Sequence, residues 1–266
     1  MNDTLYLECS SGISGDMAVA ALLDLGADRS VLERTLSGIK DEGFRFEISR
    51  VRKSGIDCCD FNVILDEAHE NHDHDMEYLY GHNAAPHDGH GEEGHHHSHR
   101  GLKEIAAIID SLDMSTGANA LAKKIFKILA EAEAKAHNRE INEVHFHEVG
   151  AIDSIVDIVA AAVCFDDLKI KEVIIPRICE GCGFVRCQHG VLPVPVPAVL
   201  NISEMYKLPL SITDHKGEYV TPTGAAFAAA VMTGTELPEI IIPKKTGLGA
   251  GKREHELPGI LRAILL

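Results

Sequence analysis

The sequence predicts a mixed α/β fold (α+β), in which helices pack on mixed sheets. Short apolar segments typical of strands alternate with Ala- and Leu-rich segments typical of helices. The 266 residues are enough to bury a large core. A histidine-rich stretch at 67–100 interrupts this pattern, so we expect two units of structure, an N-terminal α/β unit at 1–66 and a main domain at 101–266.

The N-terminal unit carries clear local signals. Gly26 ends one helical segment, Asp28 is placed to cap the next, and Lys53-Ser54-Gly55 is typical of a hairpin turn. The elements expected there are strand 4–9, helix 16–25, helix 28–39, strand 44–51 and strand 56–65.

The histidine-rich loop differs from the rest of the chain. Residues 67–99 hold ten of the 16 histidines and no Lys or Arg. Such a segment buries too little apolar surface to offset its ordering entropy, so we expect a flexible loop. Its imidazoles suit metal capture, with His95, His96, His97 and His99 as capture ligands, although a solvated linker has the same composition.

The main domain begins with helices and ends in a mixed pattern. The helices expected are 102–112, 117–137 and 154–168, the last capped by Asp153 or Ser154, followed by short helices at 197–205 and 224–233. The strands expected are 172–176, 208–213, 239–243 and 260–265.

Composition narrows the class of protein. The formal charge of -16 disfavours nucleic acid and anionic membranes as partners, because both bind clustered Lys and Arg, and it is compatible with attracting cations. No run approaches the roughly 20 apolar residues of a membrane span. The first ten residues lack the features of a signal peptide, so we expect a soluble cytoplasmic protein. The seven cysteines are irregularly spaced and form no disulfide framework.

A dense group of potential metal ligands lies between 144 and 157. It contains His145, His147, Glu148, Asp153 and Asp157. Imidazole and carboxylate groups together suit divalent transition metals such as nickel, cobalt, zinc or iron. A purely structural interpretation stays open. Asp153 could cap a helix, Asp157 could interact with the positive N-terminal end of its dipole, and the histidines could lie on an edge strand.

A second group combines thiols with an imidazole. Cys179, Cys182, Cys187 and His189 have the spacing C-x2-C-x4-C-x-H, which supplies enough ligands for a tetrahedral site. This spacing matches no common zinc finger. Three buried thiols beside a functional His189 explain it equally well.

Two loops could hold phosphate at a helix N-terminus. One contains Gly12, Gly15 and Asp16, and the other contains Thr221, Thr223 and Gly224. Both lack the P-loop lysine, and Thr223 could be a helix cap instead. The Asp16 carboxylate would repel phosphate unless a cation bridged the two groups.

Read in order, these motifs resemble the LarC family of nickel-insertion proteins. The resemblance rests on Ser11–Met17 (SGISGDM), the histidine-rich loop, Val144–Asp157, His189–Ala198 and Thr221–Ala226. It implies a lyase-class activity that inserts nickel into pyridinium-3,5-bisthiocarboxylic acid mononucleotide, with CTP and a divalent cation as co-reactants. The product would be the nickel-pincer cofactor of lactate racemase-type enzymes.

The resemblance also implies roles and partners. His145, His147, Glu148, Asp153, Asp157 and His189 match the family's ligand or proton-transfer candidates, and of these we take His147, Glu148 and His189 as catalytic. Loss of a ring proton during nickel–carbon bond formation requires a nearby base. The apo-lactate-racemase-type enzyme would accept the cofactor, and a homo-oligomer is compatible with the sequence.

The chain also departs from the family. Members commonly continue into a C-terminal CTP-binding domain, whereas this chain ends at Leu266, so we expect it to be a first part that needs a separate C-terminal part. A separately encoded part, a frameshift product and a truncation all fit. Two other functions stay open, a non-catalytic store or carrier of nickel or zinc and a metal-dependent hydrolase.

Overall fold

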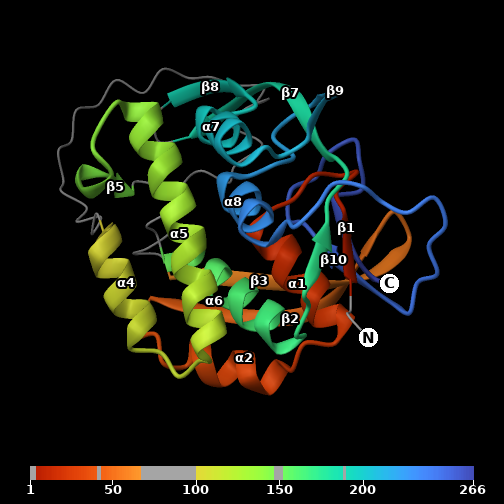
Figure 1. Ribbon diagram of the computed structural model, residues 1–266, viewed down its shortest axis with the longest axis horizontal. Helices are drawn as coiled ribbons and strands as arrows, with labels where there is room; N and C mark the ends of the chain where they lie inside the picture. Colours follow the sequence, from red (N-terminus) through yellow and green to blue (C-terminus); the bar gives the residue numbers. More distant parts are fainter. Residues whose placement is uncertain (1–3, 41–42, 67–99, 147–151, 188–189) are drawn as a thin grey trace.

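The computed structural model describes residues 4–40, 43–66, 100–146, 152–187 and 190–266 (Figure 1). Its strands are β1 (Thr4–Glu8), β2 (Phe44–Lys53), β3 (Ile56–Leu65), β4 (Arg100–Gly101), β5 (His145–Phe146), β6 (Glu172–Ile174), β7 (Ile178–Cys187), β8 (Gly190–Val194), β9 (Leu210–Lys216), β10 (Lys245–Ala250) and β11 (Ile260–Leu265). Its helices are α1 (Gly15–Leu25), α2 (Arg29–Leu36), α4 (Leu102–Asp110), α5 (Thr116–His137), α6 (Ile152–Asp167), α7 (Pro197–Tyr206) and α8 (Pro222–Val231), with a 3-10 turn at Ile141–Glu143.

The largest sheet is mixed, which confirms the predicted fold class. Its strand order is β2-β3-β10-β11-β1-β6, with β1 antiparallel to β11 and parallel to β6. A second sheet has the order β8-β7-β9, and β4 pairs with β5. Helices α1, α6 and α8 lie in the middle of the molecule in the view of Figure 1, with β2 and β3 at the level of α1 and α6. Helix α2 lies below them, and β7, β8 and β9 lie above.

Both ends of the chain contribute to the same sheet. Strands β1, β2 and β3 share it with β10 and β11, and α1 packs on it. This packing is close because β10 is rich in glycine. A Cβ atom on Gly249 would lie 2.1 Å from the carbonyl oxygen of Met17. The two units expected from the sequence therefore share a sheet and a continuous core.

Local signals in the N-terminal part are confirmed at atomic detail. Gly26 adopts a left-handed conformation (φ 115°) and ends α1. The Asp28 side chain accepts from the backbone N–H of Ser30 at 2.8 Å and caps α2. Ser54 and Gly55, both at positive φ, form the turn between the antiparallel strands β2 and β3.

Some expected elements are wrong. Residues 239–243 form no strand, because Pro238 precedes them, Pro243 ends them, and the side chains of Ile240 and Ile242 are 81% and 80% exposed. Helix α6 begins at Ile152, so Asp153 and Ser154 lie in its first turn and do not precede it as caps. Helix α8 is capped by Thr221, whose hydroxyl accepts from the N–H of Gly224 at 3.2 Å, and not by Thr223.

Other elements were missed. Strands β7, β8 and β10 carry glycines, cysteines or prolines that weaken a strand pattern. Residues 67–99 of the histidine-rich loop fall outside the described residues, and Arg100 belongs to β4. Within the described part of the chain, no helix has the length and apolar character needed to cross a membrane.

Candidate functional site

A cavity of about 730 Å³ lies where the first turns of four helices meet. Helix α1 contributes Asp16, α6 contributes Asp153 and Asp157, and α7 and α8 contribute Pro197 and Thr223. The first N–H groups of a helix lack partners within the helix and carry partial positive charge. The cavity therefore combines a field that favours anions with carboxylates that favour cations.

Two loops distant in sequence are joined at the edge of the cavity. The N–H of Ile13 donates to the carbonyl of Tyr219 at 3.0 Å, and the N–H of Thr221 donates to the carbonyl of Ile13 at 3.1 Å. Gly12 and Gly224 allow this approach, because Cβ atoms there would lie 2.0 Å from Tyr219 O and 2.2 Å from Ile13 O. The glycines expected near phosphate thus bring the two loops together.

Asp157 is the most perturbed carboxyl group of the cavity. Burial raises its pKa well above the ordinary value, and repulsion from Asp16 and Asp153 raises it further. The N–H of Asp16 donates to the Asp157 carboxylate and Lys252 attracts it, and both effects oppose the rise. Atom Oδ1 of Asp157 is buried with no hydrogen-bond partner among the described residues. A cation bound next to this carboxylate would therefore stabilise its charged form.

Further charged groups come from the segment between β10 and β11. Lys252 and Arg253 line the cavity, and Arg253 forms an ion pair with Glu218, which is 8% exposed. Ser14 donates a hydrogen bond to Asp16, whose charge also acts on Arg253. Acidic and basic groups therefore share one space in a protein of strongly negative net charge.

His255 also lines the cavity and was missed in the sequence. Its ring lies 4.4 Å from the ring of Tyr219, measured between centroids. Burial lowers the pKa of His255, and nearby Arg253 lowers it further, while a hydrogen bond to the backbone of Glu218 opposes the change. The available signal was the run Lys252–His255 directly after a glycine-rich segment.

The structure brings together only part of the predicted site. The cavity is lined by Gly15, Asp16, Asp153, Asp157, Thr221 and Thr223, while Gly12 lies in the loop before α1 and Gly224 in the first turn of α8. The backbone of His145 lies in β5, paired with Gly101. The candidates His147, Glu148 and His189, and the loop histidines His95, His96, His97 and His99, lie outside the described residues.

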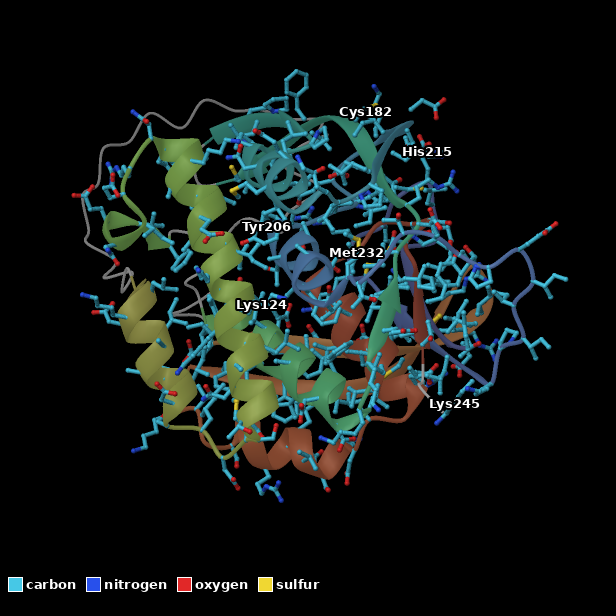
Figure 2. All side chains as sticks on the ribbon, in the orientation of Figure 1. Lys124, Cys182, Tyr206, His215, Met232 and Lys245 are labelled. Atoms are coloured by element: carbon cyan, nitrogen blue, oxygen red, sulfur yellow. The ribbon has the colours of Figure 1, made fainter. Side chains whose placement is uncertain are left out.

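The three thiols of β7 do not converge on one tetrahedral site, which is one of the two interpretations that the sequence left open. Cys182 and Cys187 are five residues apart on one strand, or about 16 Å at roughly 3.3 Å per residue. Cys179 is buried, and the Cys182 thiol accepts from Nζ of Lys216 at 3.5 Å. Figure 2 shows Cys182 beside His215 at the outer end of this sheet. Among the described residues, no group of three or more His, Cys, Asp or Glu could hold a metal ion.

Comparison with known proteins gives consistent matches. The family model described as nickel insertion protein matches residues 5–266. A pyridinium-3,5-bisthiocarboxylic acid mononucleotide nickel insertion protein of Alkaliphilus metalliredigens is 54% identical over 100% of this chain and 61% of its own length. Proteins with the same name from Acetivibrio thermocellus and Clostridium acetobutylicum are 42% and 43% identical, each over 98% of this chain and over 60% and 63% of their own lengths. The chain thus spans about three fifths of these relatives. No solved structure matches it.

Proposed function

The chain belongs to the nickel insertion protein family, and on that premise we propose that it takes part in inserting nickel into pyridinium-3,5-bisthiocarboxylic acid mononucleotide. One observation carries the proposal. The same cavity combines four helix N-termini with the carboxylates of Asp16, Asp153 and Asp157. The phosphate and thiocarboxylate groups of the mononucleotide are anionic, and nickel is a divalent cation, so the substrates match the two kinds of surface.

The phosphate group would lie against the first turns of α1 and α8. The partial positive charge at these helix N-termini favours an anion, and Thr221 and Thr223 add hydroxyl groups at the start of α8. In this proposal Gly12, Gly15 and Gly224 shape the binding loops. Lys252 supplies a positive charge for the thiocarboxylate groups.

Nickel would be held by the imidazoles of His145 and His147 and the carboxylate of Glu148, with Asp153 and Asp157 completing the set, because the described acidic residues do not by themselves form a metal-binding group. Asp16 would add negative charge beside the ion. Such mixed ligation keeps nickel exchangeable, which delivery to a substrate requires. The histidine-rich loop, residues 67–100, would capture nickel and pass it to this site. The raised pKa of Asp157 implies that nickel displaces a proton as it binds.

Insertion exchanges a ring proton for nickel without a change in oxidation state. The ring C–H bond breaks, its electron pair forms the nickel–carbon bond, and the proton passes to a base. His147, Glu148 and His189 are the proposed proton acceptors. Nickel acts as a Lewis acid that makes the ring proton easier to remove.

The remaining steps of the pathway belong to the whole protein. We assign use of CTP with a divalent cation to the part of the relatives that this chain does not span. The product would pass to an apo-lactate-racemase-type enzyme.

Reconstitution tests the proposal. The chain is mixed with the remaining part of a relative, nickel, the mononucleotide and CTP, and activation of apo-racemase is measured. We expect activation to be lost in the variants His145→Ala and His147→Ala, and to survive deletion of residues 69–99 at saturating nickel. Full activity of both histidine variants would refute the proposed nickel site. Nickel retained only through the loop would indicate a storage protein, and phosphoester turnover without CTP would indicate a hydrolase.

A further inference from the structure

Glu180 in β7 is fully buried, with 0% exposure, outside the lining of the cavity. Its Oε1 atom accepts three backbone hydrogen bonds, from Gly181 at 2.7 Å, Tyr219 at 2.8 Å and Val220 at 3.2 Å. A buried carboxylate is costly unless it is satisfied in this way. Its Oε2 atom has no hydrogen-bond partner within the described part of the chain.

The backbone held by Glu180 is the one that joins the two cavity loops. The carbonyl of Tyr219 accepts from Ile13, and the N–H of Thr221 donates back to Ile13. Ile13 lies two residues before the start of α1, and Thr221 caps α8. A single carboxylate is therefore connected, through residues 219–221, to the N-termini of two helices that line the cavity.

Close packing leaves this loop little room to move. A Cβ atom on Gly181 would lie 2.1 Å from the carbonyl oxygen of Gly217. Gly217 has a positive φ of 110°, and a Cβ there would lie 2.8 Å from Cε1 of His255. The side chain of Glu218 is meanwhile paired with Arg253. A shift at Glu180 would thus be transmitted to groups that line the cavity.

We propose that Glu180 is a positioning residue of the cavity, which holds residues 219–221 so that the N-terminal turns of α1 and α8 face one ligand. The identity of that ligand rests on the proposed function, whereas the positioning role does not.

The proton on Glu180 should modulate this role. Burial raises the pKa of Glu180 to about 7, opposed by its backbone hydrogen bonds. The charged and titratable groups around it are Glu218, Arg253 and Tyr219. A protonated carboxyl group accepts hydrogen bonds less strongly than a carboxylate. The raised pKa means, however, that the cost of burying the carboxylate outweighs this gain, so an opening that returns Glu180 to water becomes easier as the carboxylate forms. The loop should therefore be held less firmly above neutral pH than below it.

Amide hydrogen exchange of the full chain tests the role without any ligand. In Glu180→Ala, we expect exchange at Ile13, Tyr219, Val220 and Thr221 to accelerate about tenfold or more, since tenfold corresponds to the loss of about one hydrogen bond. Glu180→Gln keeps an acceptor oxygen and should restore protection. Asp24→Ala is the matched control, because Asp24 holds the N–H of Leu248 at 2.8 Å and does not line the cavity.

Binding of the mononucleotide supplies the second readout. We expect affinity to fall about tenfold in Glu180→Ala and to stay within about threefold of wild type in Glu180→Gln. Unchanged protection in a folded Glu180→Ala, or equal loss in the Gln variant, overturns the proposal. If Glu180→Ala does not fold, the amide protection factors of wild type and Glu180→Gln are measured at pH 6 and at pH 8. In wild type the protection factors of Tyr219 and Val220 should differ between the two pH values, and in Glu180→Gln they should not. The same pH dependence in both proteins overturns the proposal. If wild-type protein binds no mononucleotide, only the proposed function is refuted. The role of Glu180 is still decided by amide hydrogen exchange.

Discussion

Gly15 and Asp157 face each other so closely that a Cβ atom on Gly15 would lie 2.7 Å from Oδ2 of Asp157. The N–H of the next residue, Asp16, donates to the same carboxylate. This contact joins the first turn of α1 to the second turn of α6 at the wall of the cavity. The absence of a side chain at Gly15 thus determines where the Asp157 carboxylate lies.

Replacing Gly15 should therefore disturb the proposed nickel site before it disturbs the fold. In Gly15→Ala we expect the added methyl group to displace the Asp157 carboxylate and weaken nickel binding about tenfold, equivalent to about 1.4 kcal/mol. Calorimetric titration of nickel measures this. Gly234→Ala is the control, because a Cβ there meets nothing within 4 Å. Wild-type nickel affinity in Gly15→Ala would show that this carboxylate is not a ligand.

Asp157→Asn should stabilise the empty protein and weaken nickel binding. The pKa of Asp157 is raised in the folded state, so the folded state binds the proton more tightly than the unfolded state does. Wild-type stability consequently falls as pH rises from the unfolded pKa of about 3.8 through the folded pKa. Asparagine removes this penalty, and we expect a melting temperature a few degrees higher at pH 8, about the effect of 1 kcal/mol.

The opposite result is expected at Asp166. Hydrogen bonds from Ser115 and Lys169 lower the pKa of this carboxyl group, so Asp166→Asn should destabilise the protein at pH 8. Thermal unfolding at pH 5 and pH 8 compares the two variants. A melting temperature below that of wild type for Asp157→Asn at pH 8 would contradict the conclusion that the Asp157 carboxylate destabilises the nickel-free protein.

Glu180 should also leave a signature in the pH dependence of unfolding. Its folded pKa of about 7 lies above the ordinary value of 4.5, so its contribution to the free energy of unfolding falls between pH 4.5 and 7 and is constant above. A shift of this size corresponds to about 3 kcal/mol at about 1.4 kcal/mol per unit. Urea unfolding across this range should show a steeper loss in wild type than in Glu180→Gln. Parallel curves would mean that Glu180 titrates normally.

Local chemistry made much of the N-terminal part predictable. The end of α1 at Gly26, the Asp28 cap and the turn at Ser54-Gly55 depend on contacts within a few residues, and each was recognised. Strand β10 depends on distant contacts. Its glycines allow α1 to pack close to the strand, and the strand's own sequence does not show that a helix packs there.

The site was predictable as a list of candidates but not as an assembly. Asp16, Asp157 and Thr223 were identified separately, and only the fold shows that they line one cavity. Glu180 was overlooked because its neighbours Cys179 and Cys182 suggested a metal site instead. Its role depends on backbone groups of Tyr219 and Val220, which no spacing in the sequence indicates.

In the proposed function nickel and the mononucleotide occupy the same cavity, and one titration tests this most directly. Nickel is titrated into the chain lacking residues 69–99, with and without saturating mononucleotide, in wild type and in the Asp16→Asn/Asp157→Asn double variant. We predict that the mononucleotide tightens nickel binding about tenfold in wild type, a coupling of about 1.4 kcal/mol, and that the double variant loses this coupling. Nickel affinity that is independent of the mononucleotide, or coupling that survives in the double variant, would contradict the claim.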